Sequence, residues 1–143
     1  MRVSRAYLVS KILLADGILL IGVAFFQLLS TPVISRWLAR ELTPGTLGQI
    51  SPAFLLNHIV VGVLLIPFGI STLYSAVGVR SGQSWARGIA LTNALAVLLL
   101  PLFIALFLGP AYFTEPVFLI AAVIVTLIGI SMIVPLIWLS VRG

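Results

Sequence analysis

The sequence predicts an all-α integral membrane protein: a bundle of four transmembrane helices with a short interfacial helix in the first extracytoplasmic loop. Hydrophobic residues make up 62% of the 143 residues and charged residues only 8%, whereas a soluble domain carries about 25% charged residues. A water-soluble protein of this composition would expose large apolar patches. Four apolar stretches are each long enough to cross about 30 Å of hydrocarbon as a helix. We therefore expect a single transmembrane domain.

The predicted transmembrane helices follow one another along the chain. They cover residues 6–29, 53–79, 85–108 and 117–140. Ser51-Pro52 and Thr114-Glu115-Pro116 place a capping hydroxyl and a proline where the second and fourth helices would begin. Gly82 and Gly109-Pro110 would end the second and third. Helix is required here because lipid offers no partner for backbone N–H and C=O groups.

The longest connection joins the first two helices and contains the predicted interfacial helix, residues 33–42. Its pattern is typical of a helix that lies on a membrane surface, with an apolar side and a basic side. It could serve as a lid over the bundle or as a device that binds lipid or a partner, and the lid is the simpler interpretation. The apolar side carries Ile34, Leu38 and Leu42, and the basic side carries Arg36 and Arg40.

The basic residues predict a multi-pass protein of the plasma membrane with both termini in the cytoplasm. With this orientation six basic residues lie inside and only two outside, as the positive-inside rule requires. The inner residues are Arg2, Arg5, Lys11, Arg80, Arg87 and Arg142, and the outer ones are Arg36 and Arg40. Because the basic residues lie at helix ends rather than among clustered aromatic residues, nucleic acid is not predicted as a partner. Trp85 and Trp138 would lie at the inner interface, and Trp37 and Tyr112 at the outer one.

Small residues at spacings of four and seven predict where the helices touch, because association in lipid depends on close backbone approach. The second, third and fourth helices carry such stripes, whereas the first offers Gly22 and little else. We therefore expect the last three helices to pack most closely. The stripes are Gly62, Gly69 and Ala76; Ala86, Ala90 and Ala94; and Ala122, Thr126 and Gly129.

Two polar residues, Asp16 and Asn93, lie deep in predicted transmembrane helices, ~13 Å and ~12 Å from the cytoplasmic interface. An ionisable group at such a depth costs roughly 2.5–3.5 kcal/mol on insertion scales and is a candidate functional group. One interpretation is a proton- or cation-coupled site in which Asp16 titrates. The other, which we favour, is an interhelical clamp in which a protonated Asp16 bonds to Asn93 or the carboxylate pairs with Lys11 or Arg87.

His58 is the single histidine and lies near the outer end of the second helix, at the depth of Gln27 in the first. It could be an axial ligand of a haem or another pigment, or a proton relay. The simpler interpretation is a neutral imidazole bonded to Asn57, Gln27 or a lipid headgroup. No metal site is predicted, because the chain has no cysteine and few acidic residues. Haem through His58 is the one cofactor considered.

Arg80 and Arg87 flank the short turn that the sequence predicts between the second and third helices. Together they could bind a lipid phosphate, helped by free N–H groups at the start of the third helix. Anchoring of the turn on the cytoplasmic side is a sufficient alternative explanation.

No nucleophile signature, Gly-rich phosphate loop or pair of carboxylates is present, so an enzyme is not predicted. Short loops and the lack of a complete site favour a small non-catalytic accessory subunit of a larger membrane complex, such as an energy-transducing or oxidase complex. Its partners would be the lipid bilayer and other membrane subunits. One alternative is a homo-oligomeric transporter or channel with Asp16 and Asn93 in the pathway. Another is a subunit that binds haem or a pigment through His58.

Overall fold

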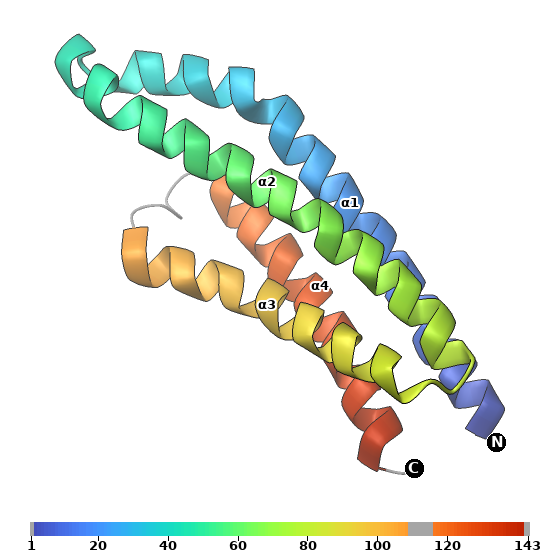
Figure 1. Ribbon diagram of the computed structural model, residues 1–143. Helices are drawn as coiled ribbons and strands as arrows, with labels where there is room; N and C mark the ends of the chain where they lie inside the picture. Colours follow the sequence, from blue (N-terminus) through green and yellow to red (C-terminus); the bar gives the residue numbers. More distant parts are fainter. Residues whose placement is uncertain (1, 109–115, 142–143) are drawn as a thin grey trace.

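The computed structural model describes residues 2–108 and 116–141, and these residues form helices without any strand. Four helices follow one another in this part of the chain, each long and apolar enough to cross a membrane. The prediction of an all-α fold with four such helices is confirmed. The helices are α1 (Arg2–Glu41), α2 (Pro44–Arg80), α3 (Ser84–Leu108) and α4 (Pro116–Val141) (Figure 1).

Helices α1 and α2 form a hairpin that is longer than the pair α3 and α4. They contain 40 and 37 residues, whereas α3 and α4 contain 25 and 26. At 1.5 Å per residue the hairpin is about 55–60 Å long and the second pair about 38 Å. The connected end of the hairpin formed by α1 and α2 projects past α3 (Figure 1). We call this end of the molecule the hairpin end, and the end where α1 begins and α4 ends the terminal end.

The structure does not contain a separate interfacial helix over residues 33–42, because this segment up to Glu41 continues α1. Pro32 lies inside α1 and lacks the N–H that would bond to the carbonyl of Leu28. The helix bends in this part of its course (Figure 1). The predicted polarity of the segment is nevertheless confirmed, since Ile34 and Leu38 are buried and Arg36 and Arg40 are exposed.

Helix α2 begins at Pro44 rather than at Ser51-Pro52, and Pro52 is inside the helix. Thr43 precedes it in extended conformation, and a proline in the first turn costs no hydrogen bond. Helix α3 begins at Ser84, one residue before the predicted start. Gly82 lies in the turn just after the end of α2, as predicted, and has a φ of 75° that an L side chain rarely adopts. The predicted signals in residues 109–115 lie outside the described residues.

The most extensive helix contact in the described residues joins α1 to α2, which corrects the expectation that the last three helices pack most closely. Gly17 of α1 faces Gly69 of α2: a Cβ added to Gly69 would lie 2.9 Å from the carbonyl oxygen of Gly17. Gly22, the residue predicted for this role, is exposed and has nothing within 4 Å of an added Cβ. The predicted stripes are buried on α2 (Gly62, Gly69, Ala76) and on α3 (Ala86, Ala90, Ala94).

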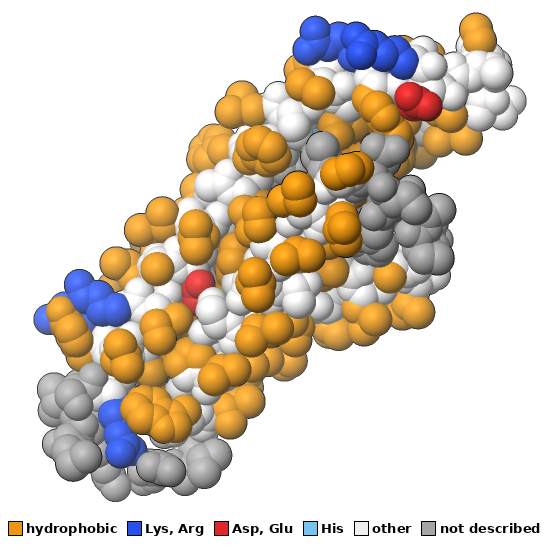
Figure 2. Space-filling model, turned by 180° about the vertical axis from the view of Figure 1, so that it is seen from behind, with side chains coloured by type: hydrophobic (Ala, Val, Ile, Leu, Met, Phe, Trp, Pro, Cys, Tyr) orange, Lys and Arg blue, Asp and Glu red, His pale blue; other side chains and the backbone are white. Residues whose placement is uncertain are grey.

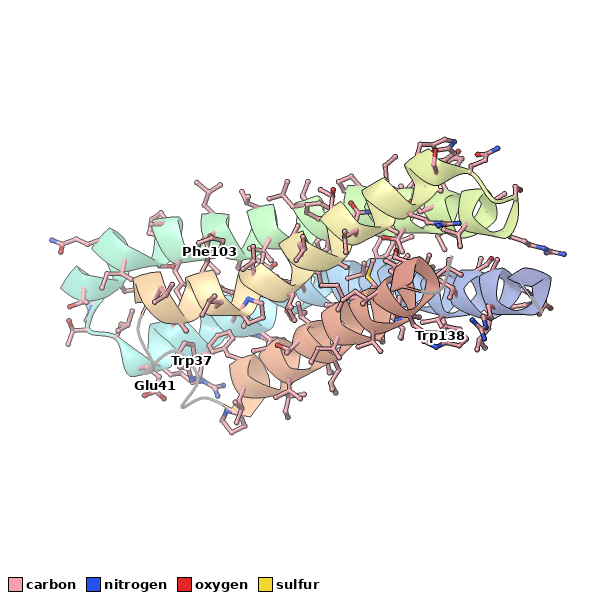
Figure 3. The ribbon with its side chains drawn as sticks, turned by 90° about the horizontal axis from the view of Figure 1, so that it is seen from below. Trp37, Glu41, Phe103 and Trp138 are labelled. Carbon is pink, nitrogen blue, oxygen red and sulfur yellow. The ribbon has the colours of Figure 1, made fainter. Side chains whose placement is uncertain are left out.

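Charged side chains gather near the two ends of the molecule, and the band between them is mostly apolar (Figure 2). At the hairpin end lie Trp37 and Glu41, and at the terminal end lies Trp138 (Figure 3). Arg5 stacks on the ring of Trp138, with its Cζ 4.9 Å from the ring centroid. Aromatic and basic side chains therefore mark both ends of a long apolar surface.

A candidate ligand pocket at the hairpin end

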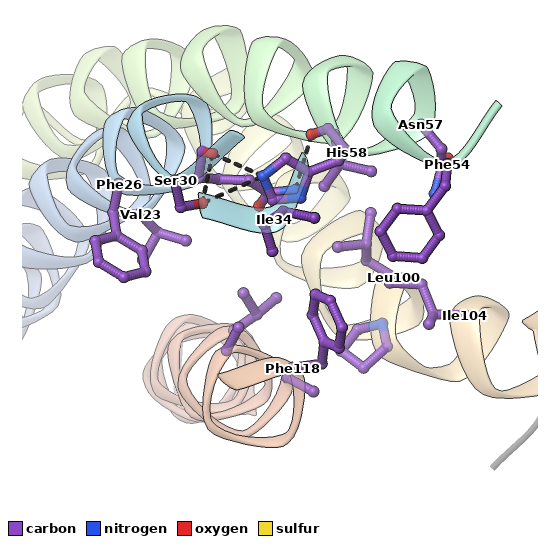
Figure 4. A pocket seen from close by; sticks show the side chains of 16 residues that line it. Val23, Phe26, Ser30, Ile34, Phe54, Asn57, His58, Leu100, Ile104 and Phe118 are labelled. Carbon is purple, nitrogen blue, oxygen red and sulfur yellow. Dashed lines mark hydrogen bonds between the residues drawn. The ribbon is translucent and has the colours of Figure 1, made fainter. Parts of the chain in front are cut away.

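A pocket lies in the half of the molecule nearer the hairpin end, where all four helices contribute to its wall (Figure 4). The cavity itself has a volume of ≈ 70 Å³, and the space free of protein atoms rises to ≈ 780 Å³ when the open region at its mouth is counted. Its lining is mainly apolar and contains no Lys, Arg, Asp or Glu. An apolar pocket with a few converging polar groups is the usual form of a small-molecule site. The lining residues are Val23, Phe26, Gln27, Ser30 and Ile34 of α1; Phe54, Asn57, His58 and Val61 of α2; Leu100, Pro101 and Ile104 of α3; and Phe118, Ala121, Ala122 and Val125 of α4.

His58 is held on one side of this pocket by two residues of α1. Its Nε2 lies 2.7 Å from the main-chain oxygen of Gln27 and 3.2 Å from Oγ of Ser30. In return Nε2 of Gln27 donates a hydrogen bond to the main-chain oxygen of His58 at 3.0 Å. Because a carbonyl oxygen only accepts, Nε2 of His58 carries a proton, and in the neutral ring Nδ1 is then an acceptor.

The approach of α1 to His58 depends on a glycine one turn further along α2. A Cβ added to Gly62 would lie 3.0 Å from side-chain atoms of Leu28 and 3.4 Å from the main-chain oxygen of Ala24. The missing side chain therefore lets the two helices come close enough for the hydrogen bonds between Gln27 and His58. Of the partners that the sequence offered for His58, the structure shows Gln27.

Three aromatic rings join the hairpin to the start of α4 above the pocket. The ring of Phe118 meets Trp37 of α1 edge to face, with centroids 5.9 Å apart, and Phe54 of α2 with centroids 6.0 Å apart. Ile34 and Leu38 are buried in the same cluster. The apolar side of the segment predicted as interfacial thus packs on the protein and not on lipid. Sequence reasoning missed Phe118 and Phe54, since a single aromatic residue at a helix end does not indicate its partner.

Asp16 and Asn93, predicted to bond to each other, contact different helices. Oδ1 of Asp16 accepts a hydrogen bond from Oγ of Ser131 on α4 at 2.6 Å, and its Oδ2 has no partner within the described residues. Nδ2 of Asn93 donates to Oγ of Ser71 at 2.7 Å and to Oγ1 of Thr72 at 3.1 Å, both on α2. Both residues are buried and link helices across the bundle. The predicted bond between them is therefore absent.

Neither Asp16 nor Asn93 lines the pocket. Along α1, Asp16 precedes Gln27 by eleven residues, which separates the two by about 16 Å. Asn57 does line the pocket, but its side chain is exposed. The predicted polar residues thus divide into a pair near the terminal half, and the group Gln27, Asn57 and His58 at the pocket.

The arrangement around His58 does not favour haem. An axial histidine usually offers one ring nitrogen to the iron and donates from the other to a carbonyl or carboxylate. Here Nε2 is the donor to Gln27, so only Nδ1, the nitrogen beside the chain attachment, remains for iron.

Comparison with models of known protein families, with curated proteins and with solved structures finds no match to this chain. The case for a function therefore depends on the pocket and on the chemistry of the groups around it.

Proposed function

We propose that this chain is a small non-catalytic membrane subunit that holds a neutral, lipid-soluble molecule in the pocket at the hairpin end. The pocket itself carries the proposal: it has walls from four helices, a lining without charged side chains, and polar groups gathered around His58. A charged headgroup would lose its hydration here without gaining a counter-ion. A neutral head is therefore expected.

The hydrogen bonds of His58 indicate what this head should offer. Nε2 of His58 and Oγ of Ser30 both direct their protons to the main-chain oxygen of Gln27. Nδ1 of His58, which has no hydrogen-bond partner among the described residues, is then an acceptor that a ligand could use. A molecule whose head donates a hydrogen bond, such as a long-chain alcohol or a quinol, fits this chemistry. Its apolar tail would lie among the side chains of α3 and α4.

The proposal includes insertion in the plasma membrane with the terminal end on the cytoplasmic side. Among the basic residues whose side chains the structure describes, four lie toward the terminal end and two toward the hairpin end. This difference supports the orientation by the positive-inside rule. The terminal set is Arg5, Lys11, Arg80 and Arg87, and the hairpin set is Arg36 and Arg40.

A role as an accessory subunit would place other membrane proteins beside the chain. Large apolar side chains are exposed along all four helices, and they suit contact with either lipid or a partner helix. Purification in mild detergent followed by mass spectrometry should recover partner subunits in a fixed ratio. A chain recovered alone from every mild detergent would contradict this part of the proposal.

Photolabelling tests the pocket directly. The purified protein in nanodiscs is exposed to a diazirine-bearing farnesol, and the labelled peptides are identified by mass spectrometry. We expect labelling of the peptides that contain Phe54 and Phe118. Ala122→Phe should fill the pocket and abolish this labelling, whereas Ala39→Phe, at an exposed position outside the pocket, should leave it unchanged.

Competition separates the role of the hydroxyl group from that of the tail. Unlabelled farnesol should compete about fivefold better than farnesyl methyl ether, because the ether lacks the proton that Nδ1 of His58 would accept. Palmitate should compete poorly, since the pocket offers no positive charge. Equal competition by all three compounds, or labelling that survives Ala122→Phe, would overturn the proposal.

A further inference from the structure

A second groove, at the terminal end, brings together two basic side chains from different helices. It lies between α1 and α2 and is lined by Tyr7, Ser10, Lys11, Leu14, Ala76, Val77, Arg80 and Ser81. Nζ of Lys11 lies 5.4 Å from the centroid of the Tyr7 ring, and Cζ of Arg80 lies 5.3 Å from the same centroid. One aromatic ring therefore holds two cations at the rim of one groove.

The positive charge of this groove is not neutralised by the described part of the chain. Asp16, the nearest carboxylate along α1, is buried and bonded to Ser131 of α4, and Glu41 is at the far end of α1. The two cations are no more than about 11 Å apart, since both lie close to one ring. They repel each other, and an anion close to both would add two attractions that outweigh this repulsion.

The groove combines basic side chains with an apolar wall, as the binding of a lipid requires. Its rim carries Lys11 and Arg80, with hydroxyl groups from Ser10 and Ser81, whereas Leu14, Ala76 and Val77 form an apolar wall. A headgroup phosphate would meet the two cations and the hydroxyl group of Ser10, since the hydroxyl of Ser81 donates to the main-chain oxygen of Val77. The chain below the phosphate would follow the apolar wall. Arginine and lysine at this level of a membrane protein are the usual ligands of anionic lipid headgroups.

We propose that this groove binds a phosphate group carried by an anionic lipid, with Lys11 and Arg80 as its ligands and Tyr7 as the residue that positions them. The site differs from the one expected from sequence, because Lys11 and not Arg87 lies with Arg80 in the groove. It is independent of the pocket at the hairpin end, which has no charged lining residue.

Native mass spectrometry of the whole chain with added lipid tests the site. We expect the protein to retain one phosphatidylglycerol molecule under collisional activation that strips phosphatidylcholine. The double variant Lys11→Gln/Arg80→Gln should bind phosphatidylglycerol about 25-fold more weakly, roughly fivefold for each cation. Arg36→Gln/Arg40→Gln removes the same charge from exposed positions at the other end and should leave retention unchanged.

Two further measurements decide the source of the phosphate and the role of the ring. Inorganic phosphate at millimolar concentration should not displace the lipid; displacement would show a site for free phosphate and would overturn the lipid assignment. Tyr7→Leu should weaken retention, whereas Tyr7→Phe, which keeps the aromatic face, should restore it. Equal retention of the two lipids by the native protein, or an equal loss in the Arg36→Gln/Arg40→Gln control, would also overturn the proposal.

Discussion

The terminal half and the hairpin half of this bundle are held together in different ways. In the terminal half the helices meet through residues with little or no side chain, as where Gly17 faces Gly69 and where an added Cβ at Gly78 would collide with Ala86. In the hairpin half large aromatic rings lie between the helices. Phe118 of α4 meets the ring of Trp37 of α1 edge to face. The terminal half is closed by backbone contact. In the hairpin half α1 and α2 still approach closely at Gly62, and the pocket lies where α3 and α4 face them.

This difference follows from the solvent that the four apolar helices would have. Lipid tails solvate leucine as well as a protein core does, so burying apolar surface gains little and close backbone approach decides where helices adhere. Small residues are concentrated in the terminal half of α3, at Ala86, Ala90 and Ala94, and all three are fully buried. The pocket lies further along α3, beside Leu100 and Ile104. The position of the small residues on α3 thus determines where α3 packs closely and where it leaves room for the pocket.

The largest effect on stability is expected from Gly69→Val, which tests the close packing of the terminal half. Its Cβ would lie 2.5 Å from Cγ1 of Ile21 and 2.9 Å from the main-chain oxygen of Gly17, and backbone cannot move aside cheaply. Overpacking of this kind costs typically about 1–3 kcal/mol. Thermal unfolding in detergent should show a clearly lower midpoint. Gly22→Val, at a position with nothing within 4 Å, is the matched control and should unfold like the native protein; equal losses in both variants would contradict the packing argument.

A smaller effect is expected from Asn93→Ala. The amide of Asn93 donates to Ser71 and Thr72 across the contact of α3 with α2. Polar contacts between membrane helices contribute on average about 0.6 kcal/mol and at most about 1.7 kcal/mol. Thr92→Ala removes a neighbouring hydroxyl that bonds only to Gly88 of its own helix, so it should have less effect. A loss of stability in Thr92→Ala equal to that in Asn93→Ala would argue against an interhelical role for the amide.

The sequence predicts well the features that depend on local signals. The start of α3, the turn at Gly82 and the buried stripes of α2 and α3 each follow from residues a few positions apart. Prolines misled the prediction at Pro32 and Pro52, since both lie inside helices. In a long helix a proline costs the bond of one carbonyl, and all other backbone groups stay satisfied when the helix continues.

The sites were harder to predict, because they depend on how each helix is rotated about its axis. Equal depth was enough to bring His58 to Gln27. The same reasoning failed for Asp16 and Asn93, which lie at similar depth but face α4 and α2 respectively. Depth can be counted from the sequence, whereas rotation is set by the contacts between Gly17, Gly69 and their neighbours.

The smallest effect is expected from Asp16→Asn, and it tests whether the terminal half is structural or functional. Asparagine keeps an oxygen at the place of Oδ1 that can accept the hydrogen bond from Ser131, so the contact of α1 with α4 should persist. The unfolding midpoint and the recovery of partner subunits should be close to those of the native protein. A transporter in which Asp16 carries the coupling proton would instead lose pH-dependent uptake in proteoliposomes with its fold intact. Ser131→Ala removes the donor and leaves the carboxyl group of Asp16 in place. It should therefore lower the unfolding midpoint, and in a transporter of this kind it would leave pH-dependent uptake intact. The two variants together therefore separate a clamp from a proton carrier.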